Sequence, residues 1–373
     1  MRFLTNISCL LVGVLFVFSG FVKAVDPSGF AYKLTEYFLL DEFRFFATDL
    51  LIDTSLVQSV LICGFEIFLG FGLIVRHNMK LWSKPLVLMI IFFTFLTGYS
   101  WGFDVVKECG CFGNAIPLTA GQSFIKDLIL LVFTGLIYFR RKSIIPVIGS
   151  SNMLRNFTYL GGVLSIAISV YGLIHLPLVD FRAFKEGAHI NDGINDGESA
   201  IIEYFYLMTK GTEEKLIAAA EYGDYSSNGW SMKSYEEKII KAEKKPSIED
   251  FNIMDEDGND FTAAILANNN YYFFLICKHI EDAETDGLVK AAELAFGHTG
   301  ITTIGLTASG ITEIEAVKAA TGLEFNFYTC DEKVLATFIR SNPGLVLLKG
   351  DQVIKKWHYN DIPTAEEIKA IIE

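Results

Sequence analysis

The chain has 373 residues, of which 51% are hydrophobic, and its mean hydropathy of +0.37 is too high for an ordinary soluble enzyme. Its charge is divided unevenly: residues 1–180 carry 13 basic and 11 acidic residues, whereas residues 181–373 carry 18 basic and 33 acidic ones. This asymmetry indicates a membrane half followed by an acidic soluble half, and so negative a domain argues against nucleic acid as a partner.

Five apolar segments approach the roughly 20 residues that a membrane helix needs. They are residues 3–22, 54–75, 85–103, 119–139 and 156–179. The first segment lacks a small-residue cleavage site and is followed by Lys23, which favours a retained span over a signal peptide. Aromatic residues crowd the segment 29–51, which we expect to lie along the membrane surface and to cap the outer end of the bundle; a substrate lid is an alternative.

The short loops predict the orientation of these spans. Basic residues gather in residues 76–84 and 140–155, so the positive-inside rule places both loops in the cytoplasm. The amino terminus is then cytoplasmic, and the residues after the fifth span are outside. For a bacterium this predicts an inner-membrane protein whose carboxy-terminal half is periplasmic, where disulfides persist.

Four ionisable residues fall within or beside the predicted spans: Lys23, Glu66, Lys126 and Asp127. Each is costly in a bilayer unless it is paired or hydrated, and two cations with two anions can neutralise each other. We expect Glu66 to pair with Lys23 or Lys126. The cluster either fixes helix packing or forms a proton or quinone-headgroup site.

Two cysteines, Cys109 and Cys111, stand one residue apart in the loop between the third and fourth spans. Gly110 and Gly113 favour a tight turn there, on exposed backbone where the chain re-enters the bilayer. A disulfide between residues two apart is strained and therefore readily reduced, which suits exchange with a partner. A constitutive disulfide or two inert thiols are the alternatives. No metal is expected, because the loop offers no further Cys or His ligand.

The membrane half resembles a known family through three motifs in order. These are VFSGFVKAVDPSGF at 17–30, GFEIFLGFGLIV at 64–75 and CGCFG at 109–113. Together they resemble the DoxX-like bacterial membrane proteins, and CGCFG is most similar to the methylamine-utilisation protein MauE. The resemblance covers residues 1–142 and implies a four-helix membrane module linked to thiol–disulfide or quinone chemistry and to maturation of periplasmic proteins. Residues 143–180 add a cytoplasmic loop and a fifth span.

The second half begins with polar residues. The segment 189–200 is rich in Gly and Asp and predicts a linker, and the segment 211–245 predicts a helical hairpin broken at 223–229. We therefore expect residues 181–245 to form a linker and a helical hairpin.

From residue 246 onward, strands and helices alternate. The sequence predicts a hairpin at 251–262 with Asp257-Gly258 at its tip, buried strands at 271–277 and 301–309, a strand at 325–330 and a final hairpin, with helices between and after them. Residues 246–373 resemble the thioredoxin-like fold, in the subgroup of TlpA-like oxidoreductases and peroxiredoxins. The resemblance places Pro343 at the cis-proline position and Ile280-Glu281-Asp282-Ala283 where Cys-x-x-Cys would stand.

Two further cysteines, Cys277 and Cys330, end different strands of this domain. They form a disulfide, act as a secondary thiol pair or are simply buried, and buried thiols are the default. Two functional hypotheses remain open. In the first, Cys109 and Cys111 exchange disulfides with a periplasmic client or redox partner, with a quinone as a possible cofactor. In the second, the protein is a non-enzymatic membrane scaffold whose thioredoxin-like domain binds a protein.

Overall fold

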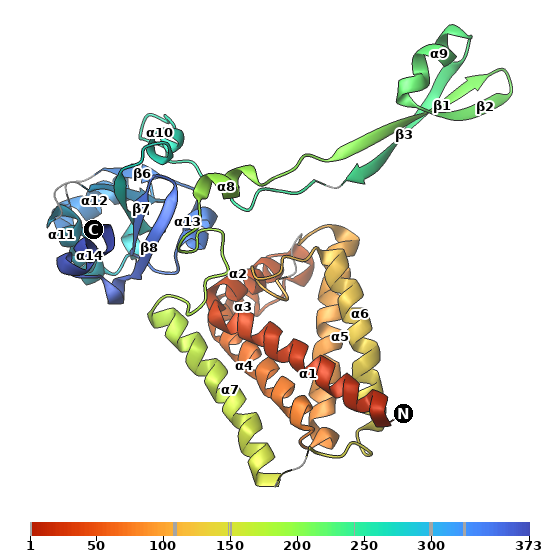
Figure 1. The fold of residues 1–373 in the computed structure, drawn as a ribbon, viewed down its shortest axis with the longest axis horizontal. Helices are drawn as coiled ribbons and strands as arrows, with labels where there is room; N and C mark the ends of the chain where they lie inside the picture. Colours follow the sequence, from red (N-terminus) through yellow and green to blue (C-terminus); the bar gives the residue numbers. More distant parts are fainter. Residues whose placement is uncertain are drawn as a thin grey trace.

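The structure is a computed structural model that describes residues 2–106, 110–147, 149, 151–241, 243–297, 301–323 and 326–373. A helical bundle contains the first half of the chain (Figure 1). An α/β domain contains the carboxyl terminus, and a narrow arm of strands projects from it (Figure 1).

Five helices of the bundle are long and apolar enough to cross a membrane, as the sequence predicts. They are α1 (Arg2–Val25), α4 (Ser55–Val75), α5 (Met79–Phe103), α6 (Ala120–Arg140) and α7 (Ser151–Ile174). The fifth helix begins five residues before its predicted start and ends five before its predicted end. Gly13 and Gly70 lie at the crossing of α1 and α4, where a Cβ atom on either would come within 2.9 Å of the other's carbonyl oxygen. These glycines allow the close backbone approach typical of packed membrane helices.

The segment after α1 folds onto the end of the bundle that lies beside the α/β domain (Figure 1). It forms α2 (Pro27–Phe38), the short helix η1 (Asp41–Phe43) and α3 (Thr48–Asp53). Asp26 caps α2 by accepting a hydrogen bond of 3.0 Å from the Gly29 amide. Ser59 of α4 donates a hydrogen bond of 2.7 Å to the Pro27 carbonyl. The α2 side chains that face the bundle are buried, so this helix is a cap with a packed face.

A five-stranded sheet in the order β6-β5-β4-β7-β8 forms the centre of the α/β domain. Its strands are β4 (Tyr271–Cys277), β5 (Thr302–Thr307), β6 (Phe327–Thr329), β7 (Gly344–Lys349) and β8 (Gln352–His358). The strands β4, β5 and β6 are parallel, whereas β7 and β8 form the predicted antiparallel hairpin. Helices and loops cover both faces and bury two apolar clusters. The helices are α10 (Thr262–Leu266), η3 (Ile280–Asp282), α11 (Thr285–Gly297), α12 (Ile311–Thr321), α13 (Glu332–Phe338), η4 (Tyr359–Asp361) and α14 (Ala365–Ile372).

The hairpin predicted at 251–262 is reduced to a turn with one isolated bridge, between Met254 and Asp260. The Asp255 carboxylate accepts hydrogen bonds from the amides of Asp257 and Asn259. This local bonding of an aspartate side chain replaces a regular strand ladder.

The helical hairpin predicted at 211–245 is wrong. The chain forms β1 (Ile201–Lys210), β2 (Glu213–Ala218), η2 (Ala219–Glu221), α9 (Tyr222–Ser227) and β3 (Ser231–Lys241), in a sheet of order β2-β1-β3. The strand β1 is rich in β-branched and aromatic residues, and its pairing with β2 and β3 overrides the helical propensity of their Glu and Lys residues.

The predicted linker before this arm is also more ordered than expected. The segment 189–200 contains the short helix α8 (Ile190–Asn195), and Ile190 is fully buried. Phe184 stacks on Phe338 with ring centroids 4.1 Å apart. Both Phe184 and Ile190 belong to the core of the α/β domain, so this domain begins before the predicted boundary at residue 246.

Candidate functional site

The cysteine loop connects α5 to α6. Cys109 lies outside the described residues, and the description resumes at Gly110. Gly110 and Gly113 have φ values of 68° and 48°, and the Gly113 amide donates a hydrogen bond of 3.0 Å to the Gly110 carbonyl. A side chain would strain such a conformation, so glycine is suited to both positions of the predicted turn. Thr119 then caps α6 through reciprocal bonding with Gln122.

Cys111 is half-buried and is joined to the bundle through its main chain. The Ser19 hydroxyl, on α1, lies 2.8 Å from the Cys111 carbonyl oxygen, to which it donates a hydrogen bond. The same hydroxyl lies 3.4 Å from Oε2 of Glu66 on α4. Phe112 is buried against Phe18, with ring centroids 5.6 Å apart. The loop is therefore held directly above an ionisable group of the bundle.

Glu66 forms an ion pair with Lys23, one of its two expected partners. The Lys23 Nζ lies 2.5 Å from Oε1 of Glu66, and the two side chains are only 3% and 4% exposed. The rings of Phe30 and Phe93 lie 4.9 and 5.3 Å from the same Nζ. Because the two charges cancel and the rings attract the cation, this arrangement compensates part of the desolvation cost.

Lys126 and Asp127 form a second pair beside the first, with Nζ and Oδ1 2.5 Å apart. Thr97 of α5 donates a hydrogen bond of 3.2 Å to the other Asp127 oxygen. The Lys126 Nζ lies 5.3 Å from the ring centroid of Phe112. Both ion pairs and Cys111 line one pocket. Its lining is Leu15, Phe16, Ser19, Lys23, Glu66, Ile90, Phe93, Cys111, Phe112, Lys126, Asp127 and Leu130.

The sequence indicated all four charged residues of this pocket but not Ser19. Ser19 lies four residues before Lys23 on α1, so the two share one face of that helix. A polar residue four positions from a lysine in a membrane helix could therefore have indicated that Ser19 belongs to the same site. Its distant partner, the Cys111 carbonyl, is not visible in any local pattern.

The structure does not bring Cys277 and Cys330 together. Cys277 ends β4 and packs in the apolar cluster on one face of the sheet, whereas Cys330 follows β6 and packs in the cluster on the other face. Both thiols are buried and neither is in a disulfide. Burial raises the pKa of the Cys330 thiol to about 12 and raises that of Cys277 further. Neither thiol is suited to exchange chemistry.

Polar groups lie along one edge of the sheet, at the carboxyl end of β4. The peptide bond between Asn342 and Pro343 is cis, and the Asn342 side chain donates a hydrogen bond of 2.9 Å from Nδ2 to the His279 carbonyl. The short helix η3 occupies the place predicted for the redox motif. Ser309 fixes η3 by accepting a hydrogen bond from the Ile280 amide and donating one to the Glu281 carboxylate. Within the described residues, no cysteine is exposed at this edge.

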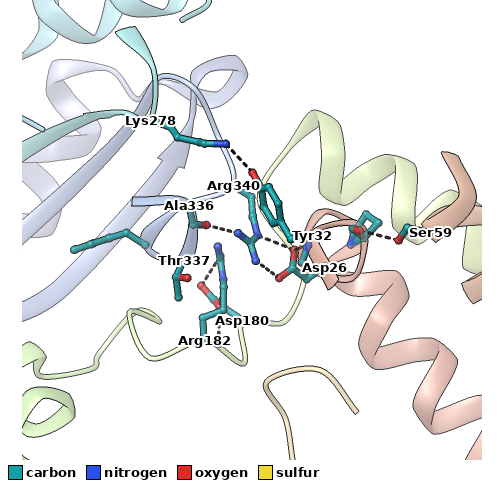
Figure 2. A network of polar contacts seen from close by, with 12 residues as sticks. Asp26, Tyr32, Ser59, Asp180, Arg182, Lys278, Ala336, Thr337 and Arg340 are labelled. Carbon is teal, nitrogen blue, oxygen red and sulfur yellow. Dashed lines mark hydrogen bonds and ion pairs between the residues drawn. The ribbon is translucent and has the colours of Figure 1, made fainter. Parts of the chain in front are cut away.

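This edge lies against the membrane bundle (Figure 2). The Arg340 guanidinium donates two hydrogen bonds of 2.8 Å, one to each carboxylate oxygen of Asp26. Burial alone would raise the pKa of Asp26, but the Arg340 charge and hydrogen bonds hold it below its usual value. Lys278 donates a hydrogen bond of 3.3 Å to the Tyr32 hydroxyl of α2. The α2 cap therefore joins the two halves of the chain.

Residues 1–140 match a protein family described as methylamine utilisation protein MauE. The membrane half of the chain is MauE-like. No curated protein matches the chain. The MauE-like region ends at the last residue of α6, so it contains Ser19, both ion pairs, the cysteine loop and the α2 cap. The helix α7, the strand arm and the α/β domain lie outside it.

Proposed function

We propose that the MauE-like region is a membrane thiol–disulfide component that acts through Cys109 and Cys111 and supports the maturation of exported proteins. The observation that supports this proposal most strongly is the position of the Ser19 hydroxyl, which donates a hydrogen bond to the Cys111 carbonyl and lies 3.4 Å from the buried carboxylate of Glu66. This position places the cysteine loop beside the buried ion pair of Glu66 and Lys23.

The proposed reaction transfers two electrons from a client dithiol. A client thiolate attacks one sulfur of the Cys109–Cys111 disulfide, forms a mixed disulfide and releases the other cysteine as a thiolate, which takes up a proton. The second client thiolate then attacks the mixed disulfide, leaving an oxidised client and a second reduced cysteine. A quinone can accept two electrons and two protons from the reduced pair, which restores the disulfide and yields a quinol.

The two ion pairs supply polar groups for proton movement near the loop. Glu66 lies 3.4 Å from the Ser19 hydroxyl, which contacts the loop, and Lys126 lines the same pocket. Paired ionisable groups within membrane helices are common at proton and ligand sites. The rings of Phe93 and Phe112 form apolar walls of this pocket.

In this proposal the α/β domain is thioredoxin-like and binds the client without exchanging disulfides. Its buried cysteines cannot attack a client, and Glu281 and Asp282 stand at the position of the redox motif. The edge beside the cis Asn342-Pro343 peptide lies next to α2, so a client bound there would be near the cysteine loop.

The proposed location is the inner membrane of a bacterium, with the α/β domain in the periplasm. Cysteines introduced at Lys80 and Lys142 should resist a membrane-impermeant thiol reagent in intact spheroplasts, whereas one introduced at His189 should react. Protection at position 189 would place the domain in the cytoplasm and contradict the redox proposal.

The scaffold function is the second candidate, and the buried state of Cys277 and Cys330 favours it for the α/β domain taken alone. Cys109→Ser and Cys111→Ser separate the two functions. Accumulation of reduced client, at an unchanged level of the membrane protein, supports exchange. Full client maturation without either thiol would leave only the scaffold.

A further inference from the structure

One end of the helical bundle carries basic residues without any acidic ones. The segments 1–22, 76–103 and 139–179 contain no Asp or Glu. The basic residues at this end are Arg2, Arg76, Lys80, Lys84, Arg140, Arg141, Lys142 and Arg155. In the part of the chain that the structure describes, none of the eight forms an ion pair with a carboxylate. This end lies away from the α/β domain, on the side of the amino terminus (Figure 1).

Two of these arginines line a pocket between the start of α1 and the end of α6. Its lining is Arg2, Thr5, Asn6, Arg140, Ser143, Ile144 and Ile145. Arg2, Thr5 and Asn6 are spaced to lie on one face of α1. Arg140 is the last residue of α6, and the next residues form the turn that borders the pocket. The pocket thus brings together two guanidinium groups from residues that are far apart in the sequence.

The chemistry of this pocket suits a phosphate group. A guanidinium is always charged and binds two phosphate oxygens in a planar fork, and two such groups can neutralise one anionic phosphodiester. The hydroxyl of Ser143 and the side-chain amide of Asn6 are further hydrogen-bond donors in the lining. The amino-terminal end of the α1 dipole adds positive potential on the same side.

The rest of the lining indicates a lipid rather than a free anion. Ile144 and Ile145 form an apolar side of the pocket, and the Ile145 side chain is 61% exposed. The pocket lies at the end of membrane-spanning helices, where headgroups meet protein. Basic pockets between membrane helices bind anionic headgroups. We propose that this pocket binds the phosphate of an anionic phospholipid, with Arg2 and Arg140 as its ligands and the two isoleucines against the lipid backbone.

Native mass spectrometry of the full chain in detergent tests this site. The probes are phosphatidylglycerol, phosphatidylcholine and inorganic phosphate. Wild type should retain phosphatidylglycerol in preference to phosphatidylcholine, and Arg2→Gln with Arg140→Gln should lower this retention on the order of tenfold. The matched control is Lys80→Gln with Lys84→Gln, which removes the same charge at the same end outside the pocket. It should lower retention less than threefold, a bound that follows from the weak attraction of a diffuse surface charge.

The outcomes are distinct. An equal loss in the control variant would show diffuse attraction to a basic surface and overturn the pocket. Complete displacement of the lipid by millimolar inorganic phosphate would overturn the lipid assignment. Arg2→Lys with Arg140→Lys keeps both charges but removes the planar fork, so it should fold and retain an intermediate amount of lipid. Retention equal to wild type in that variant would contradict bidentate binding.

Discussion

The Arg340 guanidinium and the Asp26 carboxylate meet through two hydrogen bonds although 314 residues separate them in the chain. Gly29 makes room for this pair, because a Cβ atom there would lie 2.9 Å from the Arg340 Nη2. One turn further along α2, a Cβ atom at Gly110 would lie 3.3 Å from the Cγ atom of Lys33. The α2 cap thus touches both the α/β domain and the cysteine loop.

Breaking this pair should loosen α2. Asp26→Asn leaves the Arg340 charge with no equivalent partner at a site where its side chain is only 10% exposed. Loss of one partner from such a pair costs about 2–5 kcal/mol, and the 20% exposure of Asp26 favours the lower part of that range. Hydrogen exchange of the α2 amides should become faster while α4 is unchanged. Lys33→Gln is the control on the same helix, since its exposed pair with Glu36 contributes little.

The same contact should depend on acidity. The pKa of Asp26 in the folded chain is lowered, so its stabilising effect is fully present above pH 3.8, the ordinary value, and is lost as the pH falls through the lower folded value. Protection of the α2 amides, corrected for intrinsic exchange rates, should therefore fall on acidification below pH 3.8. Asp26→Asn should show a flat profile in this window; a wild-type profile that was equally flat would contradict the role of the carboxylate.

Glu66→Gln should destabilise the membrane bundle. It leaves the buried Lys23 ammonium without a counterion, which costs about 3–5 kcal/mol when a buried pair loses one member. Thermal unfolding of the detergent-solubilised protein should shift to lower temperature. Adding Lys23→Gln removes both charges and should recover most of the loss. If Glu66→Gln unfolds like wild type yet stops client oxidation, the pair serves chemistry rather than packing.

The thiols of the α/β domain should be inert in the folded protein. With a pKa of about 12, Cys330 is ionised in about one molecule in ten thousand at pH 8, on the order of a thousandfold less than an ordinary exposed thiol. In the Cys109→Ser, Cys111→Ser variant, maleimide should label neither Cys277 nor Cys330 until denaturant is added. The same variant should reduce insulin no faster than dithiothreitol alone. Faster turnover would make one of these cysteines catalytic.

Features with a local signal could be predicted from the sequence. The five spans follow from long apolar runs, and the strands β4, β7 and β8 follow from short apolar runs bounded by turns. The arm could not be predicted in this way, since β3 is exposed along its whole length and only its pairing with β1 makes it a strand. Charge balance predicted a partner for Glu66 but could not choose between Lys23 and Lys126. The contact between Asp26 and Arg340 depends on how two domains meet, for which neither segment carries a signal.

Capture of a mixed disulfide tests the central proposal most directly. Each of the variants Cys109→Ser and Cys111→Ser keeps one thiol of the loop, which can attack the disulfide of an oxidised client, form a mixed disulfide and release one client thiolate, in the reverse of the proposed exchange. Because the second loop thiol is absent, the loop cannot complete the exchange and release the client. We predict that at least one of these variants forms a covalent adduct with a client, which dithiothreitol cleaves by reduction. The double variant should form no adduct. If neither variant forms an adduct and the double variant still supports full client maturation, the loop is not an exchange site and the proposed function is wrong.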